Sequence, residues 1–170
     1  MSYISFIVKD MKTDVIIFLA KYLIFVIAAI GAVYWLKVNK NKKVTLAASV
    51  ILGVAVALVL AKIFSKAYYH PRPFVVKHIN PLVAHGNDNG FPSEHTTAAT
   101  AMATVGYLHH KKLGIILLAL AVLVGLARIW ANVHSPLDIA GGLVCGLAGA
   151  VLGYYIVYKL MPLRSAKHSD

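Results

Sequence analysis

The stretch "NGFPSEHTTAATAMA", residues 89–103, places the polar residues Ser93, Glu94 and His95 where an alanine-rich run begins. Pro92 followed by Ser93 is typical of a helix start, with Ser93 as the N-cap residue. Because the N–H groups of a first helical turn have no partner within the helix, such a terminus can bind an anion such as phosphate. The alternative is that Ser93 only caps the helix and that His95 lies satisfied in an interface.

The rest of the chain is apolar enough to be a membrane protein. Of its 170 residues 59% are hydrophobic, against about 45–50% in soluble domains, and the mean hydropathy is +0.74. Crossing about 30 Å of hydrocarbon takes roughly 20 apolar residues. Runs of that kind are Asp14–Leu36, Val44–Phe64, Leu113–Ala131 and Pro136–Leu160, and Ser93–Leu108 is a shorter, more polar fifth. We expect an all-α integral-membrane helical bundle of about five transmembrane helices, forming a single domain over residues 1–170.

Two other segments have a predicted place in this bundle. Residues 1–13 alternate apolar residues with Lys9, Asp10 and Lys12, which favours a short interfacial helix over a cleaved signal peptide. Residues 141–153, "GGLVCGLAGAVLG", present small side chains at helical intervals, so neighbouring helices can approach closely. Packing within the bundle is the preferred interpretation, and a homodimer seam is the alternative.

The basic residues indicate an orientation in the bilayer. A formal charge of +11 would suggest nucleic acid as the partner of a soluble protein, but here the Lys and Arg residues lie mostly in loops between spans. One side receives Lys37, Lys40, Lys42, Lys43, Lys111, Lys112, Lys159, Arg164 and Lys167. We therefore expect that side and the C-terminus to lie in the cytoplasm and the second side to face outward. We expect no nucleic-acid partner.

The single cysteine, Cys145, can form neither a disulfide within the chain nor a cysteine-based metal site.

Three polar stretches fall on the outward side. In the stretch from residue 127 to residue 138, a spacing of four residues lets the Asp138 carboxylate reach His134. This contact would fix the tautomer of His134 and make its other nitrogen more nucleophilic. Arg72 lies between two prolines, and a guanidinium suits the oxygens of a phosphate. The stretches are "KAYYHPRPF" (66–74), "FPSEH" (91–95) and "ARIWANVHSPLD" (127–138).

Each of these features has a purely structural explanation when taken alone. His134 could be an interfacial histidine beside a capping aspartate, and Arg72 could contact lipid headgroups. Together they indicate a phosphoryl-transfer site. Two arginines, Arg72 and Arg128, and a helix N-terminus would hold a phosphoryl group while His134 attacks it, Asp138 steers His134, and His95 protonates the departing oxygen.

These residues also follow a known pattern, because the sequence resembles the type 2 phosphatidic acid phosphatase superfamily of membrane phosphatases. The signature of that family has three blocks: Lys, six residues, Arg-Pro; then Pro-Ser-Gly-His; then Ser-Arg, five residues, His, three residues, Asp. The matching residues here are Arg72-Pro73, Pro92-Ser93 with His95, and Arg128 with His134 and Asp138. Ser65 stands where the family has Lys, with Lys66 one place too close to Arg72. Glu94 and Ala127 replace the family's glycine and serine.

An acidic residue at position 94 is most similar to the bacterial undecaprenyl-diphosphatase branch of this superfamily. The resemblance implies a polyprenyl pyrophosphate substrate, a multi-pass protein of the bacterial inner or plasma membrane, and no metal or other cofactor. It implies a phosphohistidine on His134, oriented by Asp138, with His95 as the acid that later activates water. The residues expected around the substrate phosphates are Arg72, Arg128, Ser93, Lys66 and Glu94.

Three alternatives stay open. The catalytic blocks do not read the lipid tail, so a phosphatase acting on phosphatidic acid or phosphatidylglycerophosphate fits them equally. A small haem-binding membrane protein could use His95 and His134 as axial ligands. A catalytically inactive lipid-binding relative is the third. The other polar residues of the outer segment are His70, His78, His85 and Asp88. They could shape the entrance for the pyrophosphate or be solvated loop residues, and their spacing does not decide between the two.

Overall fold

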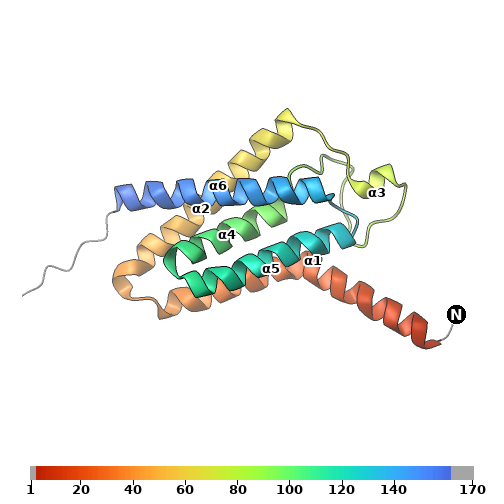
Figure 1. Cartoon of the computed structure of the whole chain (residues 1–170), viewed down its shortest axis with the longest axis horizontal. Coiled ribbons are helices and arrows are strands. Elements are labelled where there is room, and N and C mark those ends of the chain that lie inside the picture. Colours follow the sequence, from red (N-terminus) through yellow and green to blue (C-terminus); the bar gives the residue numbers. More distant parts are fainter. Residues whose placement is uncertain (1–2, 162–170) are drawn as a thin grey trace, which may run out of the picture.

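The described part of the chain forms a bundle of five long helices and one short one (Figure 1). A computed structural model describes residues 3–161, so Arg164 and Lys167 lie outside the described residues. The helices are α1 (Tyr3–Lys37), α2 (Lys40–Ala67), α3 (Pro73–Val76), α4 (Glu94–His109), α5 (Lys111–Trp130) and α6 (Pro136–Leu160). The expected all-α membrane bundle is confirmed.

Four of these helices are long and apolar enough to cross a membrane: residues 12–37 of α1, together with α2, α5 and α6. The fifth, α4, has 16 residues and is about 24 Å long at 1.5 Å per residue. The N-terminal segment expected as a separate interfacial helix is instead continuous with α1. Neither Pro nor Gly occurs between residues 3 and 30, so nothing in the sequence ends the helix before the span begins.

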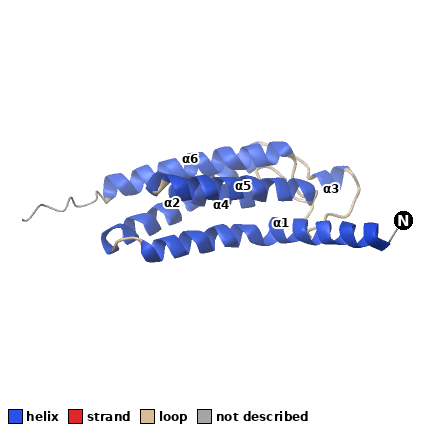
Figure 2. Ribbon diagram, turned by 60° about the horizontal axis from the view of Figure 1, so that its bottom comes forward, coloured by secondary structure: helices blue, strands red, loops and turns tan. Residues whose placement is uncertain are grey.

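Helix α4 occupies the centre of the bundle. It packs against α5, α6 and α2, and less extensively against α1, and Figure 2 shows α4 and α5 lying between α1 and α6. Its buried face carries small side chains, among them Ala99, Ala101 and Ala103, which are completely buried. Small side chains let four neighbours approach one helix, which explains why the shortest of the five main helices is also the most enclosed.

The glycine-rich pattern of α6 is used inside the monomer. A Cβ atom added at Gly149 would lie 2.3 Å from the Cα atom of Ala57 in α2. One added at Gly146 would lie 2.6 Å from the backbone oxygen of Thr97 in α4. Because any side chain at these positions would collide with a neighbouring backbone, the glycines set the close approach of α6 to both helices.

The connections between helices separate into two ends of the bundle (Figure 1). The α1–α2 and α4–α5 connections and the end of α6 share one end, which carries the lysine-rich loops. The long segment between α2 and α4 and the short turn between α5 and α6 share the other. The three polar stretches are therefore brought to one end of the molecule.

Candidate active site

The turn between α5 and α6 places His134 and Asp138 one above the other. Ser135 is the N-cap residue of α6, and its hydroxyl accepts a hydrogen bond from the Asp138 backbone N–H (3.2 Å). In return Asp138 Oδ2 accepts a hydrogen bond from the Ser135 backbone N–H at 2.7 Å. This reciprocal pair is a capping box, and it holds a completely buried carboxylate at the first turn of the helix.

Two histidines share the neighbourhood of that carboxylate. His70 Nδ1 lies 2.8 Å from Asp138 Oδ1, whereas His134 Nδ1 lies 3.5 Å from Asp138 Oδ2. The closer partner of His134 Nδ1 is the Gly90 carbonyl oxygen, at 2.9 Å. Because a carbonyl oxygen can only accept, Nδ1 of His134 carries the hydrogen, and the lone pair of the neutral ring lies on Nε2.

Burial lowers the pKa of His134, and the hydrogen bond to Asp138 opposes that shift. The positive charges of Arg128 and Arg72 lower the pKa further. The net direction is downward, so the ring is neutral at neutral pH and Nε2 is available as a nucleophile.

Arg72 directs its guanidinium at this nitrogen. The side chain is buried, and Nη1 lies 3.3 Å from His134 Nε2 while donating to the Val133 carbonyl at 3.0 Å. Nε donates to Asp88 Oδ1 at 2.8 Å and Nη2 to the Asn89 carbonyl at 3.3 Å. These contacts fix the plane of the guanidinium, so that the cation is in place before an anion arrives.

Arg128, near the end of α5, is the second guanidinium and is 1% exposed. Its Nη1 donates to the Ala20 carbonyl of α1 at 3.3 Å, and its Nη2 contacts Nε2 of His85. Its Nε has no hydrogen-bond partner among the described residues. An unpaired N–H on a buried cation is costly unless a ligand supplies the acceptor.

Asn89 joins the segments that surround these groups. Its side-chain N–H groups donate to the carbonyls of Ser65 and Tyr68, each at 2.8 Å. Its Oδ1 accepts from the backbone N–H groups of His70 (2.9 Å) and Phe91 (3.0 Å). One amide therefore connects the end of α2, the arginine-bearing loop and the approach to α4.

The groups converge on a cavity of about 320 Å³. Among the residues expected at the site, His134, His95, Arg72, Arg128 and Glu94 line this cavity, and Asp138 lies behind His134. Further lining residues are Ala61, Lys62, Ser65, His85, Asp88, Asn89, Phe91 and Pro92. Three histidines, two guanidiniums and a helix start around one small space suit an anionic group.

Two of the expected phosphate contacts do not line the cavity. Ser93 is completely buried, and its hydroxyl accepts hydrogen bonds from the backbone N–H and the hydroxyl of Thr96, so it caps α4. Lys66 is exposed and lies outside the lining. Ala127, which replaces the family's serine, packs in an apolar cluster with Phe74 and Val133.

The sequence alone left the role of several polar residues of this site open. His70, His85 and Asp88 contact Asp138, Arg128 and Arg72 respectively, and these partners are far away in the sequence. The available signal was their concentration in one loop segment, residues 68–93, between two long helices.

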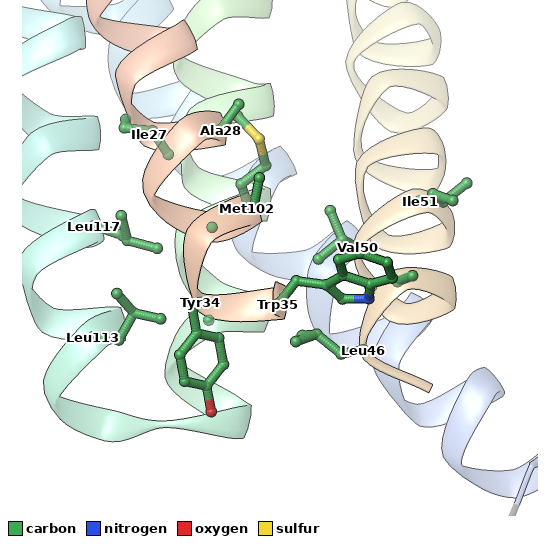
Figure 3. A pocket seen from close by; sticks show the side chains of 14 residues that line it. Ile27, Ala28, Tyr34, Trp35, Leu46, Val50, Ile51, Met102, Leu113 and Leu117 are labelled. Carbon is green, nitrogen blue, oxygen red and sulfur yellow. The ribbon is translucent and has the colours of Figure 1, made fainter. Parts of the chain in front are cut away.

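A second cavity, of about 300 Å³, lies near the opposite end of the bundle, between α1, α2, α4 and α5. Figure 3 shows Trp35 of α1 beside Leu46 and Val50 of α2, with Met102 of α4 nearby. Its lining is apolar apart from the Tyr34 phenol and the Trp35 indole. An anionic group therefore fits the first cavity and not this one.

Comparison with known proteins identifies a family pattern over most of the chain. The PAP2 superfamily model matches residues 42–162. The bacitracin transport permease protein BcrC of Bacillus licheniformis is 36% identical over 89% of this chain and 74% of its own length. The undecaprenyl-diphosphatase BcrC of Bacillus subtilis is 33% identical over 79% and 69%.

A solved structure has the same fold. It is the first transmembrane PAP2-type phosphatidylglycerolphosphate phosphatase from Bacillus subtilis, with a TM-score of 0.65 and 24% sequence identity. The match covers 89% of this chain and 79% of that chain. At that identity the likeness describes the fold alone.

The His85 contact predicts a pH dependence of stability. Burial, followed by the charges of Arg72, Arg128 and His134, lowers the pKa of His85 from 6.5 to about 4. Between these values the unfolded chain binds a proton that the folded chain does not, so the free energy of unfolding falls as the pH is lowered through this window. Thermal unfolding in detergent between pH 7 and 4.5 should show a smaller decrease of Tm for His85→Asn than for the wild type.

The control is His78→Asn, at an exposed position in the same segment, which should keep the wild-type decrease. The same decrease in all three proteins would contradict the assignment.

Proposed function

Because this chain belongs to the PAP2 superfamily, we propose that it hydrolyses undecaprenyl pyrophosphate to undecaprenyl phosphate and inorganic phosphate. It is a multi-pass membrane protein of a lipid phosphatase family. The observation that best supports this substrate is the 33% identity to a relative named undecaprenyl-diphosphatase, over most of both chains. In the proposed role the enzyme recycles the carrier lipid of cell-wall synthesis.

In this proposal the cavity holds the terminal phosphate between the two guanidiniums and the first turn of α4. The buried, unpaired Nε of Arg128 would donate to a phosphate oxygen, which supplies the acceptor that the described residues lack. Arg72 would transfer its Nη1 contact from His134 to the substrate. Both interactions strengthen as charge builds on the phosphoryl oxygens in the transition state.

His134 is the proposed nucleophile. Its Nε2 lone pair attacks the terminal phosphorus, the bond from that phosphorus to the bridging oxygen breaks, and undecaprenyl phosphate leaves. Support comes from the Gly90 carbonyl, which accepts from Nδ1 and leaves Nε2 for the attack. The buried Asp138 carboxylate stabilises the positive charge that the ring acquires. The nitrogen also faces the Arg72 guanidinium, and this neighbouring cation disfavours the haem alternative.

His95 is the proposed acid and base. It lines the same cavity as His134 and would give its proton to the departing phosphate oxygen. In the second step it takes a proton from water, the water oxygen attacks the phosphorus, and the bond to His134 Nε2 breaks. Inorganic phosphate is released and both histidines return to their starting forms.

The proposed orientation places the cavity on the outer side of a bacterial inner or plasma membrane and the C-terminus in the cytoplasm. Support comes from the lysines of the α1–α2 and α4–α5 connections, which share the bundle end opposite the cavity.

Substrate preference is the first test. Phosphate release in detergent should be fastest from undecaprenyl pyrophosphate and slower from phosphatidic acid and phosphatidylglycerophosphate, at equal lipid-to-detergent ratio. Faster release from either glycerophospholipid would replace the proposed substrate, and a protein with no turnover on any of the three would be an inactive relative.

Substitution of the two histidines tests the mechanism. His134→Ala should reduce phosphate release on the order of 10³-fold or more, because no nucleophile remains. His95→Ala should reduce it by roughly 10²–10⁴-fold, through loss of proton transfer. With substrate labelled at the terminal phosphate, an alkaline quench should trap label on the wild-type protein and none on His134→Ala. Label retained by His134→Ala would exclude this residue as the phosphorylated group.

The orientation can be tested with a single introduced cysteine. Asn87 is exposed in the segment near the cavity, whereas the native Cys145 is buried. In Asn87→Cys, a maleimide that does not cross membranes should label intact spheroplasts, and the wild-type chain serves as the unlabelled control. Labelling only after the cells are broken would reverse the proposed topology.

A further inference from the structure

The α2 wall of the cavity carries a cation to which no role has been assigned. This wall consists of Ala61, Lys62 and Ser65, and the family pattern has a lysine at position 65. Lys66, the nearest lysine to that position in the sequence, does not line the cavity. We propose that Lys62 is a phosphate-binding residue of this site and replaces the missing lysine from one helical turn earlier. The proposal rests on the proposed phosphatase function and adds a substrate contact to it.

Helix geometry makes this replacement feasible. Residues three apart in a helix are neighbours on one surface, and positions 62 and 65 differ by only about 4.5 Å along the helix axis. A lysine carries its ammonium on a flexible four-carbon stem that can span such a difference. Lys62 lies about 60° around the helix from Ser65 and Lys66 about 100°, and of the two lysines only Lys62 lines the cavity.

Ser65 itself is already engaged. Its hydroxyl and its backbone carbonyl both accept from the Asn89 side chain, at 3.1 and 2.8 Å. Those bonds hold the loop that carries Arg72. In this chain position 65 therefore serves the loop, and the cation comes from a different turn of the same helix.

The charge balance of the cavity favours a third cation. Its lining carries three positive groups, Lys62, Arg72 and Arg128, and two negative ones, Asp88 and Glu94. Without Lys62 these charges would cancel, yet a pyrophosphate headgroup carries more than one negative charge. Asp88 already pairs with Arg72 at 2.8 Å, and none of the ion pairs found in residues 3–161 involves Lys62. The ammonium is thus available to a substrate oxygen.

The test compares two lysines on one helix. Lys62→Met should lower kcat/KM for undecaprenyl pyrophosphate by roughly 10- to 100-fold, as expected for one charge-assisted hydrogen bond, and Lys62→Arg should recover most of the loss. Lys66→Met, also at an exposed lysine, should stay within about twofold of the wild type. Because both side chains are exposed, all three variants should unfold at the wild-type temperature. Equal activity of Lys62→Met and Lys66→Met would overturn the proposal.

A second measurement does not depend on turnover. Inorganic pyrophosphate should raise the Tm of the wild type and of Lys66→Met in detergent, and should raise that of Lys62→Met much less. If the wild type releases no phosphate from undecaprenyl pyrophosphate, the proposed substrate fails, and this comparison still decides whether Lys62 binds the anion. Equal stabilisation of both variants by pyrophosphate would show that it does not.

Discussion

The site depends on one buried carboxylate, that of Asp138. A charge removed from water is tolerated only when neighbouring donors replace the lost hydration. Here the Ser135 N–H and His70 surround it, and His134 is close by. The backbone carbonyl of the same residue accepts from the Ser93 N–H at 3.0 Å. A single position therefore links the turn before α6, the arginine-bearing loop and the start of α4.

The same principle extends to the two guanidiniums. Arg72 and Arg128 are nearly inaccessible, and each is held by backbone carbonyls as well as by a side chain of the α2–α4 segment. Carbonyls orient an arginine without cancelling its charge, so the positive potential of the cavity survives burial. Asp88, by contrast, is mostly exposed, and water screens its pairing with Arg72. The arrangement keeps two cations fixed at little electrostatic cost to an incoming anion.

Sequence reasoning predicted the helical bundle, the end at which the polar stretches meet, and five of the residues around the cavity. Apolar run lengths and motif spacing are local properties, so they can be read without coordinates. Ser93 and Lys66 show the limit of this approach. Whether a hydroxyl points into a cavity or caps its own helix, and which lysine of a turn faces a neighbour, depends on how α2 and α4 are rotated in the bundle. Asn89 was missed for the same reason, because its partners come from three segments that only the fold brings together.

The length of α4 has a consequence for the energy of catalysis on a lipid. At about 24 Å this helix is shorter than the hydrocarbon layer of about 30 Å, and in Figure 1 the start of α4 lies further inside the bundle than the end of α5 and the start of α6. In the proposed topology a lipid headgroup would reach a helix start recessed in this way by moving sideways within its own leaflet. Pulling an isoprenoid chain into water would cost about 0.8 kcal/mol for each exposed methylene-sized unit. A recessed helix start avoids that free-energy cost, because the isoprenoid tail stays surrounded by the lipid tails of the bilayer throughout the reaction.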